Sequence, residues 1–190
     1  MTTTIKVAVV FASGYGHTKA IAEAVIEGAS QEGVEVRGFH LPEVDWEYLD
    51  GADAIIFGSP TYMADVSADF AKFKDETSKR WFQMAWKDKI AAGFVNSGSW
   101  SGDKLNALQS LFHLSQQHAM IWVGLDLFPG FNSSTGKISD MNRVGSFSGL
   151  MTQANVDEGV EGIAASDFET ARHFGKRVAE ATRRWALSSP

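Results

Sequence analysis

Residues 5–18 read IKVAVVFASGYGHT, an apolar run followed by a short loop that contains two glycines. The run at residues 5–11 is almost continuously apolar, which is typical of a strand buried on both faces of a parallel sheet. The apolar spacing of residues 18–31 predicts a helix that ends before Gly33. A buried strand that turns directly into a helix is the first unit of an α/β fold.

The alternation of strands and helices continues along most of the chain. Strands joined by helices imply a parallel sheet with helices on both faces and right-handed crossovers. We expect one α/β domain over residues 1–190, with five parallel strands in the order 2-1-3-4-5. After the first two elements we expect strands at residues 34–39, 53–58, 90–96 and 119–125, and helices at residues 66–78, 103–117 and 166–185. The sequence Ser166-Asp167-Phe168-Glu169 predicts a capping box at the start of the last helix.

Residues 126–165 break this pattern and are predicted to be an insertion after the fifth strand. They are rich in Gly, Ser, Asn and Thr, show no clear period and exceed the length of an ordinary connection. Phe128, Phe131, Phe147 and Met151 are apolar residues within this polar stretch. They indicate a subunit contact or a cover over the ligand of a neighbouring chain.

The composition excludes several classes of protein. The chain has no cysteine, which excludes disulfides, thiolate metal sites and cysteine nucleophiles. The five histidines show no metal-ligand spacing, so we predict no metal site. The net charge of -6 argues against nucleic acid or an acidic membrane as partner. No apolar run approaches the ~20 residues that span a bilayer, and the N-terminus lacks the basic region of a signal peptide. We expect a cytoplasmic protein.

Three loops follow predicted strands 1, 3 and 4, whose carboxyl ends meet at one edge of such a sheet. The first loop, residues 13–18, combines glycines, hydroxyls and the free N–H groups of a helix start, which together can hold a phosphate. It lacks the Gly-Lys-Ser/Thr of a Walker loop, and Lys19 replaces the third glycine of a dinucleotide fingerprint. Taken alone, the loop is equally compatible with an ordinary capped turn.

The other two loops favour a flat ligand. Residues 58–65, GSPTYMAD, offer an aromatic ring and a thioether to the face of a heteroaromatic molecule. Residues 96–103, NSGSWSGD, offer small residues, hydroxyls and the indole of Trp100. Local packing around Pro60 and a helix cap at Ser101 or Asp103 are the alternatives. Three such loops at one sheet edge predict a binding site more strongly than any one of them.

These motifs resemble the flavodoxin-like proteins that bind flavin mononucleotide (FMN). The sequences Ser-x-Tyr-Gly-His-Thr, Gly-Ser-Pro-Thr-Tyr-Met and Asn-Ser-Gly-Ser carry the resemblance, which extends over nearly the whole chain. The group most similar to this sequence is the tryptophan-repressor-binding-protein family of NAD(P)H:quinone oxidoreductases. The resemblance implies a flavodoxin-like three-layer sandwich, FMN as cofactor, NADH or NADPH as electron donor, and a homo-oligomer, either a dimer or a tetramer.

The resemblance also assigns residues to the cofactor. For the phosphate and ribityl end it implies Ser13, Gly14, Tyr15, Gly16, His17 and Thr18. Beside the isoalloxazine it implies Pro60, Thr61, Tyr62 and Met63, and for the third loop Asn96, Ser97, Gly98, Ser99, Trp100 and Gly102. His118 corresponds to a histidine that reaches a flavin, and Trp81 to an aromatic cover of the substrate pocket. On sequence alone, His118 is equally a histidine facing a helix dipole, and Trp81 equally a core residue.

The predicted function is transfer of electrons from NAD(P)H to a quinone-like acceptor, with no catalytic residue because the flavin carries the chemistry. Tyr62 stands where the quinone reductases carry Arg, and Trp100 and Asp103 replace parts of a glycine-rich loop. These departures leave the FMN assignment in place, but they bear directly on which electron donor the protein uses. Two alternatives remain: an electron carrier without a substrate of its own, and a scaffold that binds no FMN.

Overall fold

The structure is a computed structural model that describes residues 4–188. The strands are β1 (Ile5–Phe11), β2 (Val34–His40), β3 (Ala54–Tyr62), β4 (Asp65–Val66), β5 (Ile90–Ser97), β6 (Ile121–Trp122) and β7 (Leu150–Gln153). The helices are α1 (His17–Ala29), α2 (Trp46–Gly51), α3 (Ala68–Glu76), α4 (Ser78–Phe82), α5 (Lys104–Gln117) and α6 (Ala165–Ser188), with a 3₁₀ turn at Val160–Gly162.

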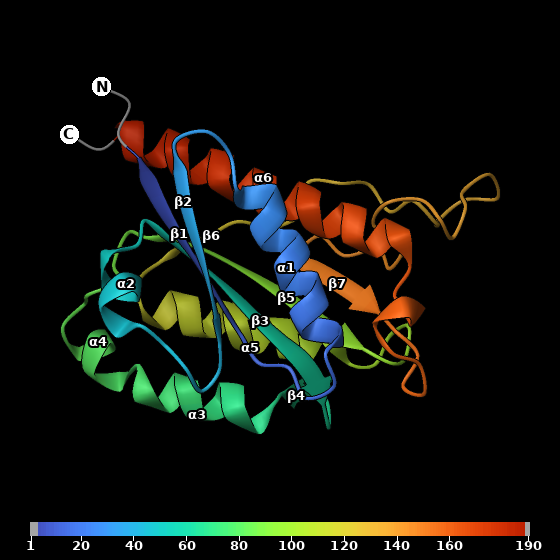
Figure 1. The fold of residues 1–190 in the computed structure, drawn as a ribbon, viewed down its shortest axis with the longest axis horizontal. Coiled ribbons are helices and arrows are strands. Elements are labelled where there is room, and N and C mark those ends of the chain that lie inside the picture. The colour runs from blue at the N-terminus through green and yellow to red at the C-terminus, as the bar shows by residue number, and fades with distance from the viewer. Residues whose placement is uncertain (1–3, 189–190) are drawn as a thin grey trace.

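The central sheet has the order β2-β1-β3-β5-β6, and these neighbours pair in parallel. The predicted fold class and strand order are therefore confirmed. Figure 1 shows α1 and α6 on one face of the sheet and α3, α4 and α5 on the other. Each face has its own apolar core, in which Ile21 and Phe174 belong to the first and Phe73 and Leu108 to the second. Parallel strands buried on both faces explain the nearly continuous apolar runs in the sequence.

Helices α1 and α6 pack against each other through glycines. A Cβ on Gly28 would lie 1.9 Å from the carbonyl oxygen of Arg172, and one on Gly175 would lie 2.0 Å from that of Val25. Only residues without a side chain permit this approach of the two backbones. The contact fixes α1, and with it the loop that precedes α1, against the long C-terminal helix.

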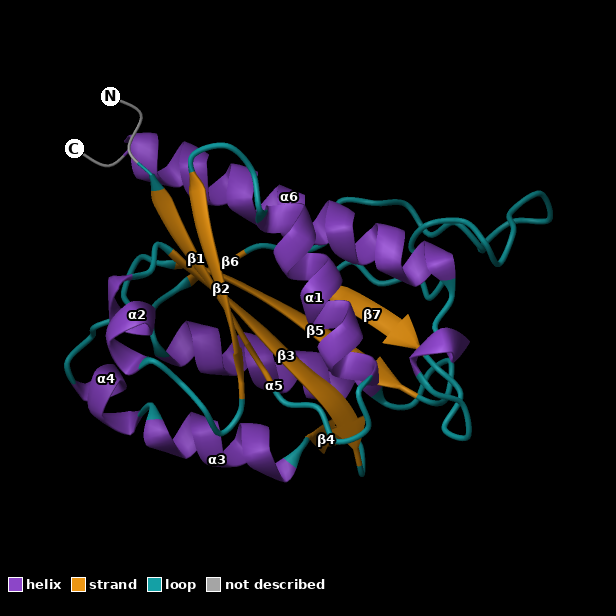
Figure 2. Cartoon of the chain, viewed as in Figure 1, coloured by secondary structure: helices purple, strands orange, loops and turns teal. Residues whose placement is uncertain are grey.

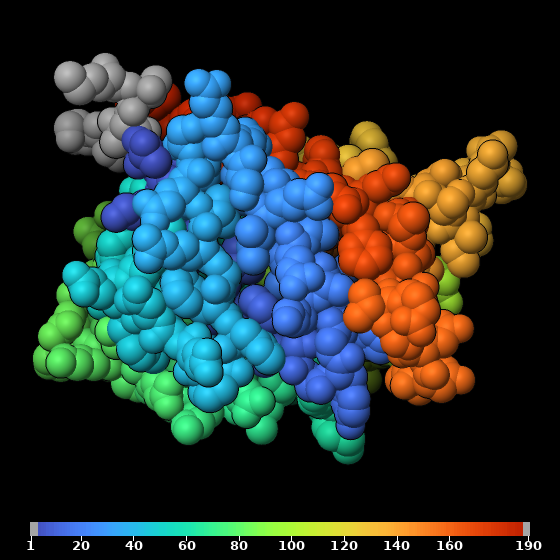
Figure 3. All heavy atoms as spheres, viewed as in Figure 1, coloured from blue at the N-terminus to red at the C-terminus, as the bar shows by residue number. Residues whose placement is uncertain are grey.

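The fifth strand differs from the prediction. It is regular only at β6, after which the chain leaves the sheet, and β7 completes the edge by pairing with residues 94–97 of β5. Beyond β6, the carboxylate of Asp126 lies 2.7 Å from His173 Nε2 and 2.9 Å from Arg177 Nη1 on α6. The insertion therefore interrupts the fifth strand rather than following it, and β7 lies inside the range 126–165. Part of this segment, gold in the colour bar, projects from the body of the molecule (Figures 1 and 3).

Other boundaries also changed. The predicted helix at residues 66–78 is the shorter α3, with the strand β4 before it and the helix α4 after it. The predicted capping box is wrong, since α6 begins at Ala165 and Ser166 Oγ donates to the carbonyl of Ile138 at 3.4 Å. Figure 2 shows that most of residues 123–149 is loop. Within residues 4–188, no helix is long and apolar enough to cross a membrane.

Candidate functional site

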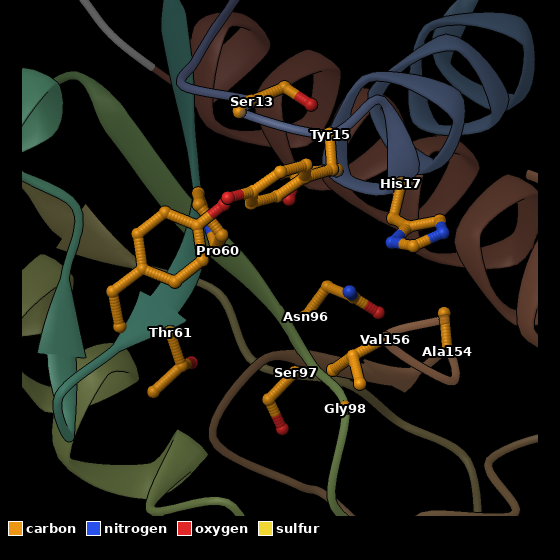
Figure 4. Close-up of a pocket in the computed structure, with 13 residues that line it drawn as sticks. Ser13, Tyr15, His17, Pro60, Thr61, Asn96, Ser97, Gly98, Ala154 and Val156 are labelled. Atoms are coloured by element: carbon orange, nitrogen blue, oxygen red, sulfur yellow. The ribbon is translucent and has the colours of Figure 1, made fainter. Parts of the chain in front are cut away.

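A cavity of about 380 Å³ opens at the carboxyl ends of β1, β3 and β5. This is the edge at which the strand order of a doubly wound sheet places a ligand. Figure 4 shows side chains from four segments arranged around it: the loop before α1, the end of β3, the end of β5, and the segment after β7. The lining residues are Ser13, Gly14, Tyr15, His17, Thr18, Pro60, Thr61, Tyr62, Asn96, Ser97, Gly98, Ala154 and Val156.

The first wall is the turn between β1 and α1. Ser13 Oγ accepts hydrogen bonds from the N–H groups of Gly16 and Lys19, each at 3.2 Å, and so holds the turn closed. Gly16 has φ of 94°, a conformation that favours glycine. Within the described residues, the N–H groups of Tyr15, His17 and Thr18 have no hydrogen-bond acceptor. Free N–H groups at a helix start attract an anion.

The second wall is the end of β3 and the hairpin that joins it to β4. Thr61 Oγ1 is buried and has no hydrogen-bond partner among the described residues, so it is free for a ligand. The ring of Tyr62 packs edge-on against that of Tyr15 at 6.5 Å between centroids. Burial, together with the neighbouring Tyr15, raises the pKa of Tyr62 and keeps its phenol neutral. Met63 and Ala64 form the hairpin turn with φ of 47° and 70°.

The third wall is held from beneath by a buried polar network. Ser97 Oγ donates to the carbonyl of Ser99 at 2.9 Å and accepts from Lys104 Nζ at 2.8 Å. Asn96 Oδ1 accepts from Thr152 Oγ1 at 2.9 Å. Gln153 Nε2 donates to the carbonyl of Gly98 at 2.8 Å. These bonds order the loop that forms the third wall.

The fourth wall, residues 154–156, was not predicted as part of the site. His17 Nε2 lies 2.9 Å from the carbonyl oxygen of Glu158 and 3.1 Å from that of Gly159, so this segment is tied to the first loop. Gly98 has no side chain where Val156 approaches, since a Cβ there would be 2.4 Å from Val156 Cγ1. The sequence carries no periodic signal at these residues, and only the interruption of the fifth strand brings them to the cavity.

The structure brings most predicted residues together. All of those in the first two loops line the cavity except Gly16 and Met63, and Asn96, Ser97 and Gly98 do so from the third. Ser99, Trp100 and Gly102 do not line it. The ring of Trp100 lies 4.7 Å from the guanidinium of Arg143 and lines a separate hollow beside the insertion.

His118 and Trp81 lie away from this cavity. His118 caps the end of α5, is 1% exposed, and packs at a tilt against Trp86 with ring centroids 4.6 Å apart. Helix α5 runs antiparallel to the strands, so its end is at the opposite edge of the sheet. His118 therefore does not line this cavity, and its contact with a flavin stays a prediction. Trp81 on α4 is 43% exposed and is not a core residue. It could reach a cavity only in another subunit.

Comparison with known proteins identifies the family. Residues 9–121 match the flavodoxin family. The chain belongs to the flavodoxin family. It is 43% identical to flavodoxin FldP of Pseudomonas aeruginosa over 92% of this chain and 95% of the relative. It is 31% identical to an NAD(P)H dehydrogenase (quinone) of Methylocella silvestris over 92% of this chain and 96% of the relative. A solved WrbA-like flavodoxin from Agrobacterium tumefaciens is 38% identical, with a TM-score of 0.73 and coverage of 95% and 98% of the two chains.

Membership of the flavodoxin family implies FMN as cofactor, and the residues present fit it. The free N–H groups of the first loop suit the phosphate. The unpartnered hydroxyl of Thr61 suits a polar atom of the ligand, and the rings of Tyr15 and Tyr62 suit a flat heteroaromatic system. None of these features requires a metal or a charged side chain in the cavity.

Proposed function

We propose that this protein is an FMN-binding oxidoreductase that transfers electrons from NADH or NADPH to a quinone or a similar flat acceptor. One observation carries the proposal. The aromatic side chains that line the cavity are Tyr15, His17 and Tyr62, from the first two loops, because the ring of Trp100 lies against Arg143 instead. The side formed by the third loop therefore presents small residues, which leave room for a second flat molecule beside the cofactor.

The bound FMN supplies the electron-transfer chemistry, and the protein binds and orients it. The first loop offers N–H groups to the phosphate, and Thr61 offers a hydroxyl that has no partner among residues 4–188. The bond from His17 to the carbonyl of Glu158 holds the fourth wall closed and limits the access of water. No protein side chain has to act as nucleophile, acid or base.

The relatives support an enzyme and also indicate where this chain differs. Two curated relatives, 29% and 31% identical, are named NAD(P)H dehydrogenase (quinone). Tyr62 replaces the Arg that the resemblance places at the mouth of the site, and a neutral phenol cannot pair with a nucleotide phosphate. We therefore propose slower reduction by nucleotides than an Arg at this position would allow.

Anaerobic reduction tests the proposal. FMN-loaded protein is mixed with NADH or NADPH, flavin bleaching is followed, and a quinone is then added. We expect bleaching by at least one nucleotide, reoxidation by the quinone, and faster bleaching in Tyr62→Arg. Met63→Arg is the matched control, because it adds the same charge at a fully exposed position outside the cavity lining. FMN that neither nucleotide reduces, in the wild type and in Tyr62→Arg, would refute the enzymatic function.

A second candidate is an electron carrier of the flavodoxin type. The 43% identity to flavodoxin FldP favours it, and so does the net charge of -6, since acidic faces dock basic redox partners. A redox titration separates the two functions. A long-lived one-electron reduced state favours the carrier, whereas direct two-electron reduction favours the enzyme.

We also propose that the protein forms a homo-oligomer. Phe82 is 83% exposed and Phe128 is 90% exposed, which is unusual for large apolar side chains. A closed, symmetric dimer or tetramer would cover them. Light scattering of the FMN-loaded protein tests this, and a monomer at all concentrations would contradict the oligomer and favour the carrier.

A further inference from the structure

A buried lysine lies directly beneath the third wall of the cavity. Lys104 is the first residue of α5 and is 1% exposed. Its Nζ donates to Ser97 Oγ at 2.8 Å and to the carbonyl of Ser99 at 2.6 Å. Ser97 lines the cavity, so the ammonium group is bonded directly to a residue of the cavity wall.

The charge of Lys104 is not neutralised by its surroundings. The nearby acid is Asp167 on α6, but its carboxylate is bound to Arg143, with Nε and Nη2 of the guanidinium both at 2.8 Å. Among the described residues, no carboxylate lies within 4.0 Å of Lys104 Nζ. Two buried cations and one buried anion leave a net positive charge in this network.

Burial of an ammonium without a counter-charge costs free energy, and the pKa of Lys104 reflects this cost. Desolvation lowers the pKa of Lys104 to about 8, with Asp167 raising it and Arg143 lowering it further. A methionine would fill the same space without this cost. The two groups that accept from Lys104 are also bonded to each other, because Ser97 Oγ donates to the carbonyl of Ser99. Loop geometry alone therefore does not require a charge at this position.

We propose that Lys104 is a positioning residue that places a positive charge in the wall of the FMN cavity and so favours the reduced form of the cofactor. This rests on FMN binding as proposed above. Uptake of two electrons and one proton, with dithionite as reductant, converts the neutral oxidised ring into an anionic reduced ring. An ammonium in the wall of the cavity would attract the added negative charge and so discriminate between the two states. A charge near the ring is one of the means by which a protein tunes a flavin.

The test compares three proteins by FMN affinity and by spectroelectrochemistry. Lys104→Met removes the charge and keeps the volume. Lys89→Met is the matched control, because Lys89 is another largely buried lysine that donates to two backbone carbonyls, those of Asp50 and Ala52, but precedes β5 at the opposite end of the strand. Wild-type FMN binding is measured first by fluorescence quenching, so that failure of the cofactor assignment is seen separately from failure of this inference.

We expect Lys104→Met to weaken the binding of reduced FMN about tenfold more than that of oxidised FMN, which lowers the two-electron midpoint potential by about 30 mV. Lys89→Met should leave the potential unchanged. The inference is overturned if Lys104→Met keeps the wild-type potential, or if both redox states lose affinity equally.

The wild type alone provides a second readout that does not depend on the folding of a variant. Below the pKa of Lys104 the charge is present, and it is lost as the pH rises through that value. The potential of bound FMN should therefore fall with pH more steeply above about pH 8 than below it. A plot without this change of slope between pH 6.5 and 9.5 contradicts the inference.

Discussion

His17 Nε2 lies 2.9 Å from the carbonyl oxygen of Glu158, a bond that spans 141 residues of sequence. It joins the helix start at the first loop to the segment that follows β7. The two walls of the cavity that are most distant in the chain are thus fixed to each other at one point. The insertion belongs to the site of its own chain and does not serve only a neighbour.

Removal of this bond should loosen the fourth wall. His17→Ala loses a hydrogen bond worth about 1 kcal/mol, so we expect FMN affinity to fall about fivefold. Cleavage by a protease within residues 155–162 should become faster, while the unfolding temperature changes little. His113→Ala is the control, since His113 is exposed on α5 and does not line the cavity. If His17→Ala and His113→Ala bind FMN with equal affinity, the bond between His17 and Glu158 does not contribute to FMN binding.

The hairpin between β3 and β4 contains removable strain. Its turn residues, Met63 and Ala64, both have positive φ, which non-glycine residues adopt at a cost of about 1 kcal/mol each. The double change Met63→Asn and Ala64→Gly matches the turn and should raise the unfolding temperature by about 2–4 °C. Gly33→Ala should act in the opposite sense, because Gly33 has φ of 74° with open space around it. Calorimetry of the cofactor-free proteins measures both, and a lower unfolding temperature for the double variant would contradict this reading of the turn.

His118 should make the protein sensitive to acid. Burial lowers its pKa to about 4. Thr77 Oγ1 donates to the carbonyl of Lys74, so it accepts from His118 Nε2. Within the described part of the chain, the buried Nδ1 has no hydrogen-bond partner, so a proton added there would find no acceptor. In the unfolded chain this histidine takes up a proton below about pH 6.5, whereas in the folded protein it does so only near pH 4. The free energy of unfolding therefore falls as the pH drops from about 6.5 to about 4.

Between pH 7 and pH 5 this histidine should lower the free energy of unfolding by about 2 kcal/mol. His118→Leu should lack that part of the acid sensitivity. Urea unfolding at the two pH values measures the difference. The same loss in the wild type and the variant would mean that another group is responsible.

The buried ion pair of Arg143 and Asp167 should matter far more than surface pairs. Their side chains are 5% and 2% exposed, and Asp167→Asn would leave two buried cations without a counter-charge. We expect a loss of about 3–5 kcal/mol in the free energy of unfolding. Glu27→Gln breaks the exposed pair with Arg172 and should cost less than about 1 kcal/mol. Urea unfolding compares the two, and similar losses would contradict the role given to the buried network.

The sequence predicted the framework well for a physical reason. The apolar runs of β1 and β5 and the amphipathic helices are local patterns, and they determine the order of the sheet. The place of the first two loops at the site was also predictable, because the carboxyl ends of parallel strands lie at the same edge of the sheet.

The failures involve contacts between distant residues. The apolar residues 121–125 read as a strand, but the regular pairing ends at β6, and Asp126 beyond it contacts His173 and Arg177 on α6. After that interruption the chain returns as β7 beside β5, which brings Ala154 and Val156 to the cavity. The resemblance placed Trp100 in the site, whereas Arg143, a residue of the insertion, holds its ring elsewhere.

The most direct measurement is the affinity of the wild-type protein for FMN and for riboflavin, by fluorescence quenching at pH 7. The free N–H groups of Tyr15, His17 and Thr18 are assigned to the phosphate, which riboflavin lacks. Each hydrogen bond to a charged group is worth about 1.5–3 kcal/mol, so we expect one FMN per chain, bound at least about a hundredfold more tightly than riboflavin. Equal affinity for the two flavins, or no binding of either, would contradict the assignment of this cavity.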